Sequence, residues 1–342
     1  MDPAERARIR TKVRTWVARS LTPAGDQEAK AFFSECEGVA DAFVARAGEF
    51  DPELPDGDVH QALRNQWVFN SIQALYGLRV SLTPSSFAYS MLYPLTDNWL
   101  DAPGRTTEER DSFLSWLSVR LRGIREDDRW KPIARLLDLI EEEFPRPDYP
   151  DVHHSLLAIH DAQAESIRLS AGSDEASEGD LLAATLTKGG TSVLADGFLV
   201  SGALDEVRCT SVFGYGALLQ LIDDLQDLDE DIANGHSTPF VRTGEGRNLE
   251  GLTNRLLHFS RRTLGVLKEQ AGNRWLVPLI EQSCHALILE AVARHGRFYS
   301  PRYLKGMEQY MPVPLDALGR VRSAVRRKLE PAPDPNGERV LV

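Results

Sequence analysis

Cysteine is scarce in this sequence, and the three that occur, Cys36, Cys209 and Cys284, are odd in number and widely spaced. Such spacing gives neither a disulfide framework nor a zinc-binding pattern, so we expect free thiols in a reducing compartment. Apolar runs of about 18 residues, long enough to span a bilayer, are also missing. The first residues are too charged for the apolar region of a signal peptide. We therefore expect a cytoplasmic protein with no transmembrane segment.

Positive charge is in deficit as well, because 39 Lys and Arg stand against 51 Asp and Glu, a formal net charge of −12. No basic stripe dominates the chain, which argues against nucleic acid as a partner. A protein of this charge that handles an anionic substrate needs metal ions or a local basic cluster.

The alternating β-branched runs that are typical of strands are missing too. Apolar residues recur instead at intervals of three and four, and 42% of the 342 residues are hydrophobic, enough for a large core. We expect one all-α domain over residues 1–329, a helical bundle, followed by a disordered tail at 330–342. The expected helices are 3–20, 26–47, 59–79, 84–101, 106–124, 130–143, 150–171, 179–204, 206–233, 249–271, 274–296 and 314–329, with a short piece near 301–310.

Two of these helices are expected to be irregular. Pro94 lies inside its helix, where it removes a backbone hydrogen bond and should kink the chain. Gly189 and Gly190 should interrupt the helix predicted over 179–204, because glycine accepts unusual backbone geometry at little steric cost. A polar loop is expected at 235–247.

Aspartates are concentrated on one predicted helix. Asp223, Asp227 and Asp231 lie four residues apart and share a face, Asp224 borders that face, and Asp229 points away and should be solvated. Like charges at this spacing repel one another and call for a counter-charge. Divalent cations such as Mg²⁺ bind carboxylate oxygens, usually one or two together with phosphate and water.

A solvated surface is the ordinary explanation of an acidic helix. Here the acids alternate with Leu and Ile, Gln220 lies one turn before them, and a second acidic pair, Asp97 and Asp101, occurs earlier with Asn98 beside it. Each group ends an apolar helix. If the two helices face one another, their acids meet at the mouth of a bundle, where metal ions could hold phosphate.

These motifs resemble those of class I isoprenoid synthases, the all-α fold of prenyltransferases and terpene synthases. DNWLD at 97–101 resembles the first aspartate-rich motif, and QLIDDLQD at 220–227 closely resembles the second. DLDEDIANGHSTP is similar to the DxxED segment of squalene and phytoene synthases. KGGTSVLADGFL at 188–199, with HDAQAES at 160–166, looks most like the bacterial large-terpene group of tetraprenyl-β-curcumene synthase-like enzymes. The resemblance covers roughly residues 60–305.

The resemblance implies a magnesium-dependent terpene synthase, a carbon–oxygen lyase with a central cavity. Such an enzyme ionises an isoprenyl diphosphate of about C20 to C35 to a linear or cyclic terpene and releases diphosphate. Several Mg²⁺ ions would bind with the substrate. The family often forms homodimers, so a homodimer is possible. An apolar substrate also suggests transient contact with a membrane surface.

The resemblance also assigns roles to residues. Asp97, Asn98 and Asp101 would bind metal from one side of the cavity, although Asn98 stands where many relatives carry a second aspartate. The metal ligands of the other side would be Asp223, Asp224, Asp227 and Asp231. The catalytic set would be Asp97, Asp101, Asp223, Asp224 and Asp227.

The resemblance assigns substrate binding to three kinds of residue. These are the cations Lys188, Arg297 and Arg302, the glycine Gly190, and the aromatic residues Tyr303, Phe69 and Phe198. Arg302 and Tyr303 resemble the Arg–Tyr pair that closes over diphosphate in terpene synthases, and arginine suits phosphate through its bidentate fork. Each assignment has a structural alternative. Lys188 could be a helix-surface residue, the glycines could serve close helix packing, and the phenylalanines could be ordinary core.

Two other functions stay open. A prenyltransferase could elongate chains or couple two substrates head to head. Elongation needs a second basic diphosphate site, and the presence of only Arg105 after the first motif argues against it. The DxxED match favours head-to-head coupling. A family member without catalysis could bind lipid or a partner, and Asn98 and His236 are the departures that would support it.

Overall fold

The computed structural model describes residues 23–102, 104–125, 129–170, 176–244 and 248–310. The helices expected at 3–20 and 314–329 and the tail 330–342 lie outside the described residues. Within the described part, the chain forms α-helices and two short 3-10 helices and contains no strand, so the all-α expectation is confirmed. The helices are α2 (Pro23–Phe50), α3 (Asp56–Leu75), α4 (Pro84–Asp101), α5 (Thr107–Leu121), α6 (Lys131–Glu143), α7 (Pro150–Ser170), α8 (Glu178–Ser201), α9 (Glu206–Gln226), α10 (Leu228–Asn234), α11 (Pro239–Gly244), α12 (Glu250–Gln270), α13 (Leu276–Arg294), η1 (Gly296–Phe298), α14 (Pro301–Met307) and η2 (Glu308–Tyr310).

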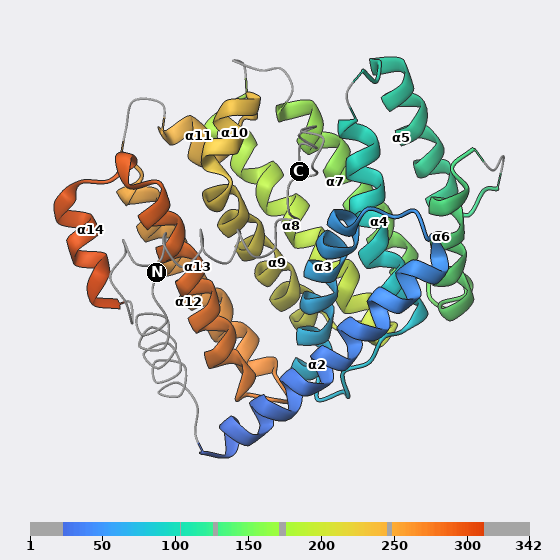
Figure 1. Cartoon of the computed structure of the whole chain (residues 1–342), viewed down its shortest axis with the longest axis horizontal. Coiled ribbons are helices and arrows are strands. Elements are labelled where there is room, and N and C mark those ends of the chain that lie inside the picture. The colour runs from blue at the N-terminus through green and yellow to red at the C-terminus, as the bar shows by residue number, and fades with distance from the viewer. Residues whose placement is uncertain (1–22, 103, 126–128, 171–175, 245–247, 311–342) are drawn as a thin grey trace, which may run out of the picture.

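The bundle is built around the adjacent helices α8 and α9. Helices α3, α4 and α7 pack against α8, while α12 and α13 pack against α9. Figure 1 shows α5 and α6 at one end of the long axis and α14 at the other, with α10 and α11 beside one end of the α8–α9 pair. Two clusters of buried apolar side chains, one mainly among α3 to α8 and one mainly among α8 to α14, form the core.

Glycines allow α8 and α9 to approach with their backbones almost in contact. A Cβ added at Gly216 would lie 2.1 Å from the carbonyl oxygen of Gly189, and one added at Gly189 would lie 2.4 Å from Cβ of Gln220. A Cβ at Gly190 would lie 2.5 Å from the ring of Phe213. The predicted interruption of this helix is therefore wrong: α8 is continuous, and its glycines serve close packing.

The helix expected over 206–233 is divided at Asp227, between α9 and α10. The break is slight, because the Asp227 amide donates to the Asp223 carbonyl at 2.9 Å and the Asp231 amide donates to the Asp227 carbonyl at 2.8 Å. The aspartates therefore keep nearly helical spacing. Gly235, with φ of 71°, ends α10 as a left-handed cap. The loop expected at 235–247 was only partly right, since it contains α11.

Helix α4 carries the first acidic motif and is fixed at its start. Thr83 and Ser86 form a capping box, and the backbone amide of Ser85 donates to Oε2 of Glu143 on α6 at 2.7 Å. The helix continues through Pro94 to Asp101. These contacts hold α4 against α6 and orient its C-terminal end toward α7.

Helix α13 is, by length and composition, the one helix of the described part that could cross a membrane, with a mean hydropathy of 1.4. Half of that segment is buried inside the bundle. Its Ile288, Ala291 and Val292 are fully buried in the core, which accounts for its apolar composition.

Candidate functional site: an acidic cavity beside an apolar one

An acidic cavity of about 170 Å³ lies among α7, α8, α9, α10 and the segment that follows α10. It is lined by all four aspartates of the predicted second metal side, Asp223, Asp224, Asp227 and Asp231. Lys188, Gln220, Thr185 and His236 line it as well. The structure thus gathers carboxylates from α9, α10 and the break between them around one space. Their spacing of about four residues, seen in the sequence, places these side chains on the same helix face.

Two of these carboxylates are held by neighbouring polar groups. Arg64, on α3, donates from Nη2 to Oδ1 of Asp223 at 2.9 Å. Asp224 is buried and accepts from Nε2 of Gln220 at 2.9 Å and from the hydroxyl of Thr185 at 3.1 Å. These bonds orient the carboxylates, and the Arg64 contact connects α3 with the end of α9.

Three carboxylates of this cavity, those of Asp224, Asp227 and Asp231, resist ionisation. Burial, with the nearby charge of Asp223 adding to it, raises the pKa of Asp224 to about 7. Burial and the charges of Asp227 and Asp223 raise the pKa of Asp231 to about 7, and burial and the charge of Asp223 raise that of Asp227 to about 6. More negative charge is therefore brought together than Lys188 and Arg64 offset, an environment that favours a bound cation.

The C-terminal end of α9 is fixed from α13. Arg294 donates from Nη1 to the carbonyl of Gln226 at 2.9 Å, and Nε2 of the buried His295 lies 3.1 Å from the same oxygen. Nδ1 of His295 lies 3.1 Å from Asp229. Cationic and N–H groups at a helix C-terminus satisfy its free carbonyls, so α13 stabilises the break that presents Asp227.

A second, apolar cavity of about 130 Å³ lies beside the acidic one, among α4, α5, α6, α7 and α8. Eight of the 18 residues that line it are aliphatic: Leu92, Leu100, Leu114, Leu117, Leu121, Leu137, Leu156 and Ile159. Lys188 and Gln220 line both cavities, so the two spaces meet at these side chains. The volume lies below the roughly 300–1,000 Å³ that small-molecule sites occupy, so a long chain requires the cavity to widen.

The first acidic motif reaches the apolar cavity through one residue. Asp97 lines that cavity and accepts from Nε2 of Gln163, on α7, at 3.1 Å. Asn98 is exposed and donates instead to Oδ1 of Asp58 at 2.8 Å. Asp101 ends α4, and its side chain lies outside the described part of the structure. The structure therefore brings Asp97 to the apolar cavity and not to the acidic one, so it does not meet the aspartates of α9 and α10 as expected, and it leaves Asn98 outside both cavities.

The late basic and aromatic residues lie elsewhere. Arg297 forms an ion pair with Asp229 at 2.5 Å; Asp229 is exposed and lines neither cavity, as its predicted direction away from the shared face implied. Tyr303 donates to Oδ1 of Asn254 at 2.9 Å and stacks on Tyr299, and Arg302 is exposed beside it on α14. Figure 1 shows α14 at the edge of the molecule, beyond α12 and α13. None of the three lines either cavity.

The remaining substrate-binding candidates divide in the same way. Lys188 lines both cavities, as described. Gly190 packs against Phe213 on α9 and lines neither. Phe69 is fully buried and Phe198 is buried, both in the core cluster around α3 to α8, so their rings fill the interior and do not form a cavity wall.

Several residues around the cavities were not found from the sequence. Arg64 is 159 positions from its partner Asp223, and no motif marks it. Asn65 lines the apolar cavity and donates to the fully buried Asp196 at 3.2 Å. Gln163 and His160, which belong to the HDAQAES motif but were given no role from the sequence, both line the apolar cavity. Their helical spacing, one turn apart, was the available signal.

No preformed metal centre is present in the described part of the chain: no three His, Cys, Asp or Glu side chains converge closely enough to hold an ion. Mg²⁺ does not require such a group, because it keeps several waters and usually takes one or two protein carboxylates with substrate phosphates. The donors around the acidic cavity are all oxygen ligands apart from His236 and Lys188, a set that suits a hard cation better than zinc.

Comparison with known proteins adds no relative: no family model, curated protein or solved structure matches this chain.

Proposed function

We propose that this protein is a magnesium-dependent class I terpene synthase that ionises an isoprenyl diphosphate and releases diphosphate. The observation that carries the proposal is the junction of the two cavities at Lys188 and Gln220. A substrate with an anionic head and an apolar tail needs an acidic, cation-binding space directly beside an aliphatic one. The same two spaces side by side have no evident use in a protein that only presents a charged surface.

The head of the substrate is assigned to the acidic cavity. Asp223, Asp227 and Asp231 provide oxygen ligands for cations that bind with the diphosphate, and Lys188 and Arg64 provide direct positive charge. When bound, Mg²⁺ supplies Lewis-acid stabilisation of the departing diphosphate. Asp224, held by Gln220 and Thr185, stiffens the end of α9 and adds negative charge behind the ligands.

The tail is assigned to the apolar cavity. Its leucines exclude water from a reactive carbocation, which would otherwise be captured at once. The ring of Tyr89 lies in the wall with its hydroxyl donating to the carbonyl of Ser192 at 3.0 Å, so a polarised aromatic face borders the space. The observed volume holds only part of a C20 chain, and the proposal requires the leucine wall to move on binding.

A product assay tests the proposal. Purified protein with Mg²⁺ is given geranyl through geranylfarnesyl and longer diphosphates, each alone and with isopentenyl diphosphate, and the products are read by mass spectrometry. A hydrocarbon or alcohol from a single substrate, lost in Asp223→Ala and in Asp227→Ala, is the expected result. A longer diphosphate or a head-to-head product would assign a prenyltransferase instead. Absence of turnover with every substrate would contradict both enzymatic functions.

A further inference from the structure

A large groove on the side of the bundle, formed by α8, α9 and α12, is separate from the two cavities described above. Its volume is about 1,020 Å³, at the upper end of the range for small-molecule sites. It shares no lining residue with the acidic or the apolar cavity. It therefore needs an explanation of its own.

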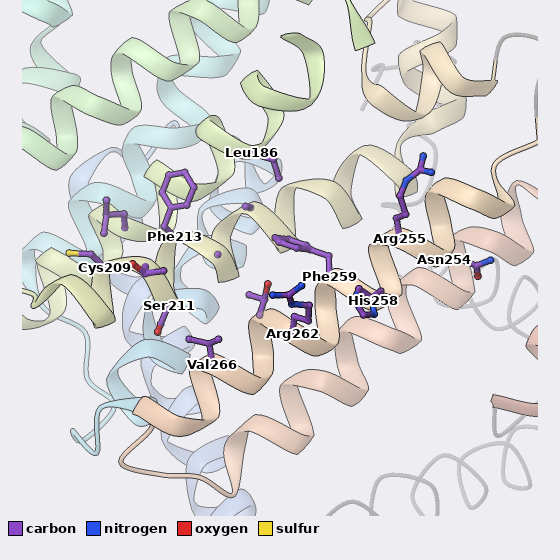
Figure 2. Close-up of a pocket in the computed structure, with 15 residues that line it drawn as sticks. Leu186, Cys209, Ser211, Phe213, Asn254, Arg255, His258, Phe259, Arg262 and Val266 are labelled. Carbon is purple, nitrogen blue, oxygen red and sulfur yellow. The ribbon is translucent and has the colours of Figure 1, made fainter. Parts of the chain in front are cut away.

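The floor of the groove is apolar. Leu186 and Leu194 come from α8, Phe213 and Ala217 from α9, and Phe259 from α12. Figure 2 shows Phe259 projecting from α12 toward α9, while the ring of Phe213 on α9 lies on the side of α8, where it packs against Gly190. The helices approach closely at Gly214, where an added Cβ would lie 3.2 Å from Thr263, so the floor is closed underneath. The shape is that of a trough, suited to an apolar chain.

The charge of the groove is opposite to that of the whole protein. Its lining contains Arg255, Arg262 and His258 and not one Asp or Glu, although the chain carries 51 acidic residues and a net charge of −12. The three lie along one side of α12, where positions three, four and seven apart share a face. In Figure 2, Arg255 lies toward one end of the groove and Arg262 near its middle. An anionic group is the complement of this edge.

We propose that this groove binds a single-chain lipid with a phosphate headgroup, the chain lying over Phe213 and Phe259 and the phosphate meeting Arg255 and Arg262. A concave trough accommodates one molecule better than it accommodates a membrane plane. Of the segments outside the described residues, the two at the ends of the sequence, 1–22 and 311–342, each contain more Lys and Arg than Asp and Glu, so they complement an arginine edge less well than a phosphate does. The proposal is independent of the proposed catalysis.

The groove provides its own reporter. Cys209 lines it and is half-buried, whereas Cys36 and Cys284 are buried in the core. An alkylating reagent such as N-ethylmaleimide should therefore modify Cys209 first in the folded protein. A lipid seated over Phe213 covers this thiol, so the rate of Cys209 modification, measured by intact mass and peptide mapping, reports occupancy without using enzymatic activity.

The probe is 18:1 lysophosphatidic acid below its critical micelle concentration, with the zwitterionic lysophosphatidylcholine of the same chain as the comparison. We expect the acid to slow Cys209 modification several-fold and the zwitterion to act only at higher concentration. In Arg255→Gln/Arg262→Gln the half-protecting concentration should rise about tenfold, the effect of losing charged hydrogen bonds. Arg261→Gln, an exposed neighbour on α12 outside the groove, should be nearly unchanged.

Other outcomes would overturn the proposal. Equal protection by both lipids would remove the role of the arginines, and protection only by vesicles would indicate a membrane surface. Protection that grows with protein concentration and needs no lipid would indicate a second copy. Asp227→Asn should keep full lipid protection, so a failed terpene synthase assay and a failed groove experiment are distinguishable.

Discussion

Arg64 on α3 and Asp223 on α9 form an ion pair of 2.9 Å at the edge of the acidic cavity, across 159 residues of sequence. The guanidinium is largely exposed, and the carboxylate is one-third exposed. A surface ion pair of this kind contributes little to stability, so the position of Arg64 matters more for what the cavity binds. Its fork can turn from the carboxylate to a phosphate without moving α3.

Arg64→Gln should weaken substrate binding more than it weakens the fold. Loss of one charged hydrogen bond to the diphosphate is expected to raise KM about tenfold, while the free energy of unfolding falls by less than about 1 kcal/mol. Steady-state kinetics and urea unfolding measure the two effects. Arg79→Gln, also exposed but distant from the cavities, is the control; an unchanged KM in Arg64→Gln would remove this residue from the site.

Adding even one methyl group at the α8–α9 contact should destabilise the fold. Gly216→Ala forces a Cβ against the Gly189 carbonyl, and we expect a loss of about 1–3 kcal/mol or more in the free energy of unfolding. Gly265→Ala on α12, where an added Cβ meets nothing within 4 Å, should instead stabilise by about 0.5–1 kcal/mol. Chemical denaturation of both variants distinguishes a packing requirement from a general glycine effect.

The buried Asp224 makes the metal-free protein less stable as the pH rises. Its pKa of about 7 in the folded state exceeds the ordinary value of 3.8, so the folded form holds the proton more tightly. The resulting stability is complete below pH 4 and is lost as the pH rises to 7, by up to about 4 kcal/mol. In EDTA, Asp224→Asn should show a smaller fall in unfolding free energy between pH 4.5 and 8 than the parent. Parallel pH profiles would contradict this account.

Glu141 on α6 should have the opposite pH dependence. Burial alone would raise its pKa, but hydrogen bonds from Arg120, Arg146 and Arg125 overcome this and lower the pKa to about 2. Its contribution is therefore complete above pH 4.5 and is lost as the pH falls toward 2.

Glu141→Gln should destabilise at pH 7 by about 3 kcal/mol, because three arginines lose their shared carboxylate, while the buried Arg120 keeps its ion pair with Asp138. Thermal unfolding at pH 7 and pH 3 measures the effect, which should shrink at the lower pH. The exposed Glu142→Gln on the same helix is the matched control, and an equal loss in both variants would contradict the role of this network.

Helical periodicity was sufficient to predict nearly every described helix. The apolar stripe is clearest in α6 and α12, where it faces the neighbouring helices. Periodicity failed at the glycines of α8, because glycine is compatible both with a helix break and with close helix packing. Gly189 and Gly190 read equally well as a helix break and as a close contact, and only the position of α9 decides between them. The aspartate spacing predicted one shared helix face, and the four aspartates do line one cavity. Their expected meeting with the first acidic group was not predictable, and Asp97 lines the other cavity.

Placement between distant segments could not be predicted. Arg302 and Tyr303 resemble a diphosphate-closing pair in type, but Tyr303 packs on α12 and bonds Asn254. Arg64 shows no signal in the sequence, because its partner is brought to it only by the packing of α3 against α8, which in turn pairs with α9. The type of a side chain can be read from the sequence directly, whereas the contact between two helices depends on the packing of the whole fold.

The measurement that tests the central claim most directly is calorimetric titration of inorganic diphosphate with and without Mg²⁺. We expect binding that requires Mg²⁺, is lost in Asp227→Asn/Asp231→Asn, and persists in Glu230→Gln, an exposed neighbour that lines neither cavity. Diphosphate binding that ignores Mg²⁺ or survives the double substitution would show that the acidic cavity does not hold a metal–diphosphate complex.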